Sequence, residues 1–208
     1  MVLSDTIPTK KSIILITDGD TIAVRAIERV ANRIGGRSIS RSGGNPTPLE
    51  GPKIQRLIWE AASDLVLVLF DDNGHTGVGP GERALQYIAT CKDFQVLGAL
   101  AVASNSYSSV AARVHVSVTK FGQIIPYGVD KHGEPLKQKL PFIYGDTVGV
   151  LNELNLPVVV GIGDIGKMRG RDIIDRDSPI TYRAVLEILR RSGYLKKTKT
   201  ATSKDNNP

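Results

Sequence analysis

The feature that most constrains this chain is a repeated alternation of buried strands with amphipathic helices. The run SIILIT, residues 12–17, is rich in β-branched residues, which is typical of a strand covered on both faces. In residues 21–34, apolar side chains recur at helical spacing until two glycines end the pattern. A strand and a helix follow again within residues 65–90, so the pattern predicts a parallel sheet with helices on both faces.

The remaining segments complete a single α/β domain. We expect further strands at residues 38–40, 96–103 and 157–163, and further helices at residues 49–60, 146–154 and 181–191. Residues 114–129, VHVSVTKFGQIIPYGV, alternate apolar and polar side chains around KFG, which predicts an inserted antiparallel β-hairpin. We therefore predict a Rossmann-like three-layer sandwich with a mostly parallel sheet over residues 1–194, followed by a basic, disordered tail at residues 195–208.

Most of the positive charge lies at the C-terminal end. The chain carries a formal charge of +6, and residues 190–208 alone hold six basic side chains against one aspartate. The rest of the chain is about neutral, which argues against a nucleic-acid partner. A Lys-, Thr-, Ser- and Asn-containing tail is typical of a solvated end, and the alternative is that it contacts anionic lipid or an acidic face of a partner.

The compartment follows from what the sequence lacks. Cys91 is the single cysteine, so an internal disulfide is excluded, and the first residues contain no apolar signal segment. The longest apolar runs fall far short of the roughly 20 residues that a membrane-spanning helix needs. We expect a chain that is made in a reducing cytoplasm and does not cross a membrane by itself.

Acidic side chains follow several of the predicted strands. The first strand is followed by Asp18 and Asp20, the third by Asp71 and Asp72, and the last by Asp164, while Glu82 opens a helix. Ligands of open α/β sheets gather at the carboxyl ends of the strands, and carboxylate oxygens suit Mg²⁺ or Ca²⁺. The pattern predicts an acidic crevice that holds a divalent cation, with Asp18, Asp20, Asp71, Asp72 and Glu82 as candidate ligands. The alternative is that each aspartate caps the helix that follows it.

Other residues near these strand ends are candidates for the same crevice. His75 lies in the acidic loop, Asn45 begins the rigid segment NPTP, and Asp164 and Lys167 follow the last strand. GIGDIG, residues 161–166, matches a dinucleotide fingerprint, but its aspartate would repel a pyrophosphate and no apolar-faced helix follows it. GVGPGE lacks the lysine of a phosphate-binding loop and is interpreted as a turn.

Several segments in a distinctive order carry a family resemblance. They span residues 11–194 and read ITDGDTIAVRAIE, SRSGGNPTPLEG, VLVLFDDNGHTGVGPGERAL, VLGALAVASNS, GDTVGVLNELNLPVVVGIGDIGKM and PITYRAVLEILRRSGY. Together they resemble the stage V sporulation protein AE family of spore-forming bacteria, and more narrowly its soluble AE(a)-type members. The resemblance implies a part in calcium dipicolinate uptake or release, other stage V sporulation A-type proteins as partners, and a peripheral position at the spore inner membrane. It supplies no catalytic residues.

Three functions stay open at this point. The first is a non-enzymatic accessory protein that docks on a membrane partner, which agrees with the resemblance and the basic tail. The second is a magnesium-dependent phosphoryl-transfer or nuclease-type enzyme, because the paired acids are similar to those of Toprim domains, although the first strand here delivers no glutamate. The third is a receiver-like phospho-aspartate switch. Its residues follow successive strands in the expected order, although the hairpin insertion and the loop lengths fit poorly: Asp18 and Asp20, Asp71, Ser104 and Lys167.

Overall fold

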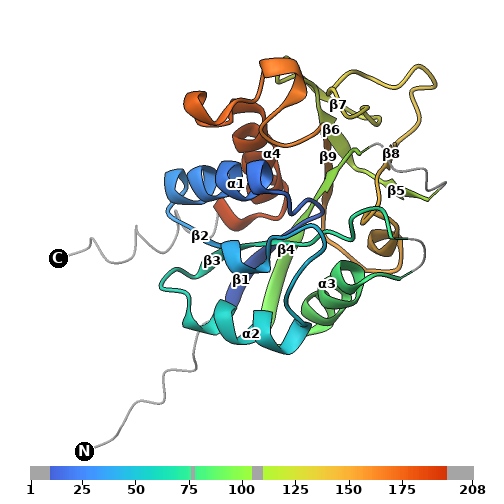
Figure 1. Cartoon of the computed structure of the whole chain (residues 1–208). Helices are drawn as coiled ribbons and strands as arrows, with labels where there is room; N and C mark the ends of the chain where they lie inside the picture. Colours follow the sequence, from blue (N-terminus) through green and yellow to red (C-terminus); the bar gives the residue numbers. More distant parts are fainter. Residues whose placement is uncertain (1–9, 76–77, 105–109, 196–208) are drawn as a thin grey trace, which may run out of the picture.

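The computed structural model describes residues 10–75, 78–104 and 110–195 (Figure 1). The strands are β1 Lys11–Ile16, β2 Arg37–Ile39, β3 Leu65–Leu69, β4 Phe94–Val102, β5 Ala111–Arg113, β6 Val116–Val118, β7 Ile124–Ile125, β8 Phe142–Tyr144 and β9 Val159–Ile162. The α-helices are α1 Thr21–Arg33, α2 Gly51–Glu60, α3 Pro80–Thr90 and α4 Pro179–Arg191, with short 3₁₀ turns η1 Ser40–Ser42, η2 Gly149–Asn152, η3 Met168–Gly170 and η4 Ile174–Arg176. The predicted tail from residue 196 onward lies outside the described residues.

Seven strands form one sheet in the order β2-β3-β1-β4-β9-β6-β7. Every neighbouring pair is parallel except β6 and β7. β1 lies near the centre, where Ile14 is opposite Leu67 of β3 on one side and Gly98 of β4 on the other. The prediction of an α/β fold with a mostly parallel sheet is confirmed.

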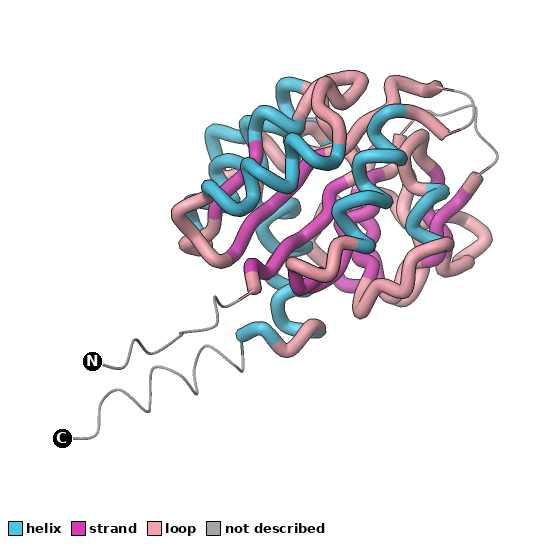
Figure 2. The backbone as a smooth tube through the Cα atoms, turned by 90° about the horizontal axis from the view of Figure 1, so that it is seen from below, coloured by secondary structure: helices cyan, strands magenta, loops and turns pink. Residues whose placement is uncertain are grey.

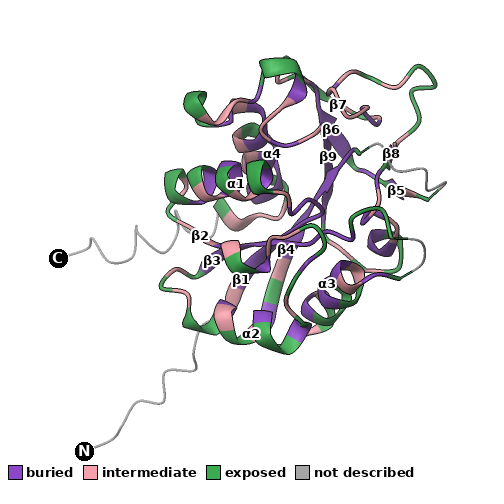
Figure 3. Ribbon diagram, viewed as in Figure 1, coloured by how far each residue is buried: buried purple, intermediate pink, exposed green. Residues whose placement is uncertain are grey.

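The helices form a layer on each face of the sheet (Figures 1 and 2). α1 and α4 pack together on one face, and α2 and α3 pack together on the other. The side chains of β1 alternate between two buried clusters, with Ile14 and Ile16 facing α1 and Ile13 and Leu15 facing α2 and α3. The central strands are mostly buried while the outer faces of the helices are exposed, as Figure 3 shows. This explains why the central strands are continuous apolar runs.

The predicted hairpin is present and lengthens the sheet. β6 pairs in parallel with β9, and β7 returns antiparallel to β6 as the last strand of that edge. A second, two-stranded sheet, β5 with β8, was not predicted from the sequence. Its strands have three residues each and lie about 30 positions apart, so neither one shows a recognisable alternation.

The predicted helix at residues 146–154 is wrong. This segment contains only the 3₁₀ turn η2, Gly149–Asn152, which packs against β5. Glycine inside the segment lowers its helix propensity, and Asp146 does not cap a helix because its carboxylate accepts a hydrogen bond from Gly74 N–H. Within the described residues, every helix is too short or too polar to cross a bilayer.

Candidate functional site

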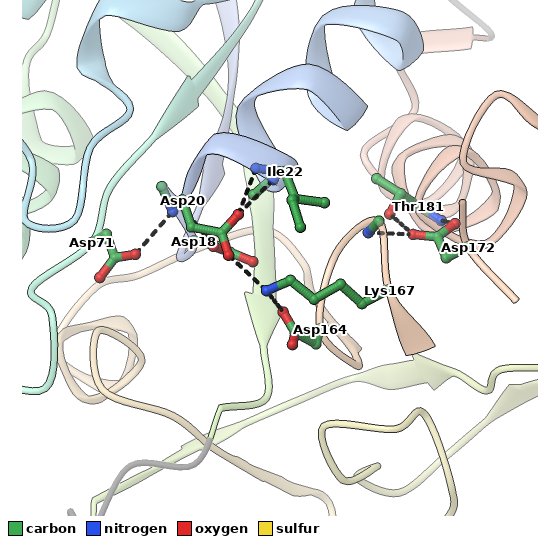
Figure 4. Close-up of polar contacts among 11 residues, drawn as sticks. Asp18, Asp20, Ile22, Asp71, Asp164, Lys167, Asp172 and Thr181 are labelled. Carbon is green, nitrogen blue, oxygen red and sulfur yellow. Dashed lines mark hydrogen bonds and ion pairs between the residues drawn. The ribbon is translucent and has the colours of Figure 1, made fainter. Parts of the chain in front are cut away.

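The carboxyl ends of the parallel strands bring the predicted acids to one edge of the sheet. β1 and β3 are adjacent and parallel, so Asp18 and Asp71 follow them on the same side. Figure 4 shows Asp18, Asp20, Asp71 and Asp164 there, with the Lys167 ammonium among them. The acidic crevice is defined here as these four aspartates together with Asp72, Glu82 and Asp146, whose charges act on one another.

Asp20 is the N-cap of α1. Its Oδ1 accepts hydrogen bonds from the N–H groups of Ile22 and Ala23, both at 2.8 Å. Capping by an aspartate satisfies donors that a helix leaves unpaired at its first turn. The capping alternative therefore holds for Asp20, whose other oxygen contacts Lys167.

Lys167 joins two of the aspartates. Its ammonium donates to Asp20 Oδ2 at 2.6 Å and to Asp164 Oδ1 at 3.0 Å. Burial alone would lower the pKa of Lys167, but the hydrogen bonds to Asp20 and Asp164 outweigh it and raise that pKa. Burial raises the pKa of Asp20, but the hydrogen bond and charge of Lys167, together with the N–H groups of Ala23 and Ile22, outweigh it and lower that pKa.

Asp71 holds two loops together. Its Oδ2 accepts from Gly19 N–H at 3.1 Å and its Oδ1 from Asn73 N–H at 2.8 Å. Its own N–H donates to Thr47 Oγ1 at 2.8 Å, which attaches the NPTP segment to this edge. Burial is the main cause that raises the pKa of Asp71 to about 6, with the charge of Asp146 adding to it.

Asp18 is a buried acid of the crevice, as Asp71 and Asp72 are. Its side chain is 9% exposed, and its Oδ1 accepts from Asp20 N–H at 3.3 Å. Burial raises the pKa of Asp18 well above its usual value, and the negative charges of Asp20, Asp164 and Asp71 raise it further. Folding therefore shifts Asp18 toward its neutral form, relative to the unfolded chain.

Asp72 and Glu82 meet at the start of α3. Asp72 accepts from Gly81 N–H at 2.6 Å and from Glu82 N–H at 2.9 Å, so it satisfies the first turn of a helix that begins eight residues later. Burial and the charge of Asp72 raise the pKa of Glu82, while a hydrogen bond from the backbone of Val150 lowers it. Glu82 therefore faces Asp72 and η2.

Two other predicted residues lie at the margin of the crevice. Asn45 is exposed in the loop that precedes Thr47, and His75 is exposed, with its backbone N–H donating to Asp72 O at 3.1 Å. In the part of the chain that the structure describes, no three side chains of Asp, Glu, His or Cys converge as a group that could hold a metal ion.

A comparison with protein families identifies the family of this chain. Residues 12–192 match the family model described as Stage V sporulation protein AE1. The chain belongs to the stage V sporulation protein AE family. No curated protein and no solved structure matches it. The resemblance noted in the sequence is confirmed, and family membership assigns the chain to sporulation.

Two aspartates of this family member were missed by sequence reasoning. Asp146 belongs to the crevice because β8 leads into it, and that strand was not predicted. Asp172 is fully buried and accepts hydrogen bonds from Gly166 N–H, Ile180 N–H, and the N–H and hydroxyl of Thr181 (Figure 4). Its place before Ser178-Pro179, a helix-start pattern, was the available signal.

The Lys167 bridge leads to a prediction about stability. We expect Lys167→Met to lower the melting temperature by about 3 °C at pH 7.5, because Asp20 and Asp164 lose their counter-charge and the bridge is only partly buried. Lys167→Arg should recover most of the loss. Thermal unfolding followed by circular dichroism measures both. The control is Lys53→Met, which removes an exposed lysine that forms no ion pair with the described residues. A Lys167→Met melting curve that matches this control would contradict the prediction.

Proposed function

We propose that this chain is a non-catalytic accessory component that docks on other stage V sporulation A-type proteins at the spore inner membrane. It would support calcium dipicolinate movement through contacts of its folded surface. The family supplies the setting, because it places the chain in sporulation. The docking role rests on two observations, the hydrogen bonds that the crevice acids form and the exposed β6–β7 hairpin.

The observation that carries this proposal is that the crevice carboxylates accept hydrogen bonds from backbone N–H groups. Asp20 caps α1, Asp72 satisfies the start of α3, and Asp71 joins the turn at Gly19 to the turn at Asn73. Each of these oxygens accepts a backbone N–H, and such carboxylates stabilise loops and helix starts. The acids therefore act as supports for the strand ends.

The β6–β7 hairpin offers a surface for a protein partner. Phe121 at its turn is 62% exposed, and Ile124 of β7 is 38% exposed. Lys120 and Arg171 place their cationic groups 5.1 and 5.3 Å from the centre of the Phe121 ring. Lys120 is ion-paired with Glu134, whereas Arg171 forms no ion pair with the described residues. An exposed aromatic ring beside such a cation is typical of an interface anchor, and it fits an apolar partner surface that carries an acidic residue.

A fractionation experiment tests docking. Dormant spores are prepared with the wild-type chain, with the Phe121→Ser variant and with a chain truncated after Gly193. A fourth strain carries the wild-type chain but lacks the membrane components, which are the other stage V sporulation A-type proteins. We expect the chain to leave the membrane fraction in Phe121→Ser spores and in spores without the membrane components, and to stay there in truncated-chain spores. Tyr87→Ser, which removes a 42%-exposed aromatic side chain on α3, is the matched control.

The outcomes of this experiment separate the body of the chain from its tail. Release of the truncated chain alone would assign membrane association to the basic tail, by an attraction that salt screens over about 8 Å. Retention of the chain without the membrane components would overturn the docking proposal. Dipicolinate content and germination rate, scored separately in the same strains, divide uptake from release.

A second candidate is a weak divalent-cation site that serves a magnesium-dependent activity in the crevice. It is favoured by the mutual repulsion of Asp18, Asp71 and Asp146, which a cation would relieve. Titration calorimetry with millimolar Mg²⁺ and Ca²⁺ should then give heat that Asp71→Asn abolishes. Absence of heat, with equal melting temperatures with and without these ions, would leave the crevice with a structural role.

A further inference from the structure

A basic groove lies at the opposite end of the sheet from the hairpin. It consists of two adjoining hollows of about 440 and 280 Å³ beside β2 and α2. The two hollows share Arg41, Leu57 and Glu60, so they form one continuous depression. β2 is the terminal strand here, as Figure 1 shows, and on one side of it no further strand of the described chain is paired.

The charge of the basic groove is strongly one-sided. Arg37, Arg41, Lys53 and Arg56 line it, against the single carboxylate of Glu60. None of the four cations forms an ion pair with any residue that the structure describes, whereas Lys11, Lys120 and Lys167 all have acidic partners. Unneutralised cations that line one depression attract an acidic ligand and steer its approach.

The walls of the basic groove between these cations are apolar. Leu49 and Pro52 line the larger hollow, Ile39 and Ala61 the smaller one, and Leu57 both. A flat membrane surface does not enter a groove of this kind. The phosphate backbone of a nucleic acid makes no favourable contact with aliphatic side chains. A peptide with acidic and aliphatic side chains satisfies both features, and its backbone can pair with the open side of β2.

The two edges of the sheet differ in their suitability for strand addition. β7 has two residues and is followed by Pro126, which has no N–H to donate. β2 contains no proline, and its residues Arg37, Ser38 and Ile39 all line the basic groove. An added peptide strand is therefore expected at β2, whereas the hairpin surface engages its partner through side chains.

We propose that the basic groove binds an extended acidic segment of a protein partner, which pairs with β2. Carboxylates of the segment meet Arg37, Arg41 and Arg56, and its aliphatic side chains contact Leu49 and Leu57. The proposal does not depend on the hairpin surface, because the two surfaces lie at opposite ends of the sheet. Peptide binding and Phe121-dependent membrane association can therefore succeed or fail separately.

Fluorescence anisotropy with a labelled peptide, EVDLEVDLE, tests the proposal. We expect saturable binding by the full-length chain, weakened at least about tenfold by Arg41→Glu/Arg56→Glu and by the milder Arg41→Gln/Arg56→Gln. Arg25→Glu/Arg176→Glu, which reverses two exposed arginines on the α1 side of the sheet, should change affinity less than about twofold. Melting temperatures equal to that of the wild type establish that the variants are folded.

Comparison probes and hydrogen exchange identify the mode of binding. The peptide should slow amide exchange in residues 37–41, and KVKVKVKVK should not bind. Equal binding of hexaglutamate, of a dT12 oligonucleotide or of vesicles with anionic lipid would overturn the proposal in favour of a general polyanion surface. Absence of binding by EVDLEVDLE, or equal affinity of the groove variants and the wild type, would also overturn it.

Discussion

Replacing Asp172 by alanine should destabilise this chain more than any other single change considered. Asp172 has no exposed surface, and four donors from Gly166, Ile180 and Thr181 meet its two oxygens. Alanine would leave the first turn of α4 and the turn after β9 with buried, unsatisfied N–H groups. We expect a loss of about 3–5 kcal/mol in the free energy of unfolding, and a melting temperature lower by about 10 °C or more.

Urea denaturation and thermal melting measure this loss. Asp175→Ala is the matched control, because Asp175 is exposed in η4 and forms no hydrogen bond or ion pair with the described residues. It should shift the melting temperature by less than about 2 °C. A similar, small shift for Asp172→Ala would show that water replaces the four hydrogen bonds and that Asp172 is not a structural anchor.

The second large effect is a decrease in stability as the pH rises from 4 to 7. The pKa of Asp71 is raised from 3.8 to about 6 in the folded chain, mainly by burial, so the folded state favours its neutral form. A raised acid pKa leaves stability intact below the unfolded pKa and reduces it as the pH rises toward the folded pKa. One pKa unit corresponds to about 1.4 kcal/mol, so ionisation of Asp71 costs about 3 kcal/mol above pH 6.

Asp18 contributes to this pH dependence with the same sign. Its pKa is raised well above the usual value by burial and by Asp20, Asp164 and Asp71. Asp18→Asn removes the charge and keeps an oxygen to accept from Asp20 N–H. We expect this variant to melt at least about 3 °C higher than the wild type at pH 7.5 and within about 1 °C of it at pH 4.

Denaturation curves at pH 4, 5.5 and 7.5 check both statements. Asp93→Asn, at an exposed position away from the crevice, controls for loss of one negative charge and should leave the pH profile unchanged. A wild-type stability that rises steadily from pH 4 to 7.5 would have the wrong sign. It would mean that the crevice acids are ionised at neutral pH and that hydrogen bonds and ion pairs stabilise their charges.

The elements that sequence reasoning predicted well are those with a strong local signal. β1 and β3 are continuous apolar runs because both of their faces are covered, and α1 begins at a residue that follows an aspartate cap. The hairpin followed from alternation on both sides of a turn. β5 and β8, by contrast, are short segments whose pairing depends on chain that lies between them, and no local pattern predicts such a pair.

The sequence predicted which acids lie at this edge of the sheet, but not the hydrogen bonds that they form. Acids after parallel strands had to meet at one edge, because β1 and β3 point the same way. Their partners were not predictable, since Asp71 is bound to Gly19 across 52 positions and Lys167 to Asp20 across 147. Whether a carboxylate caps a helix, joins two turns or stays neutral depends on distances that only the packed chain sets.

The sequence by itself determined the layers of this protein, the parallel direction of its central strands and its family, because burial periodicity and residue order are local properties. Only the tertiary structure decided that Asp172 anchors α4, that Asp146 acts on the crevice acids, and that four cations share a groove beside β2. These features arise where distant segments meet. Solvent exclusion and the distances between charges set pKa values and binding surfaces, and both depend on how these distant segments pack in the folded chain.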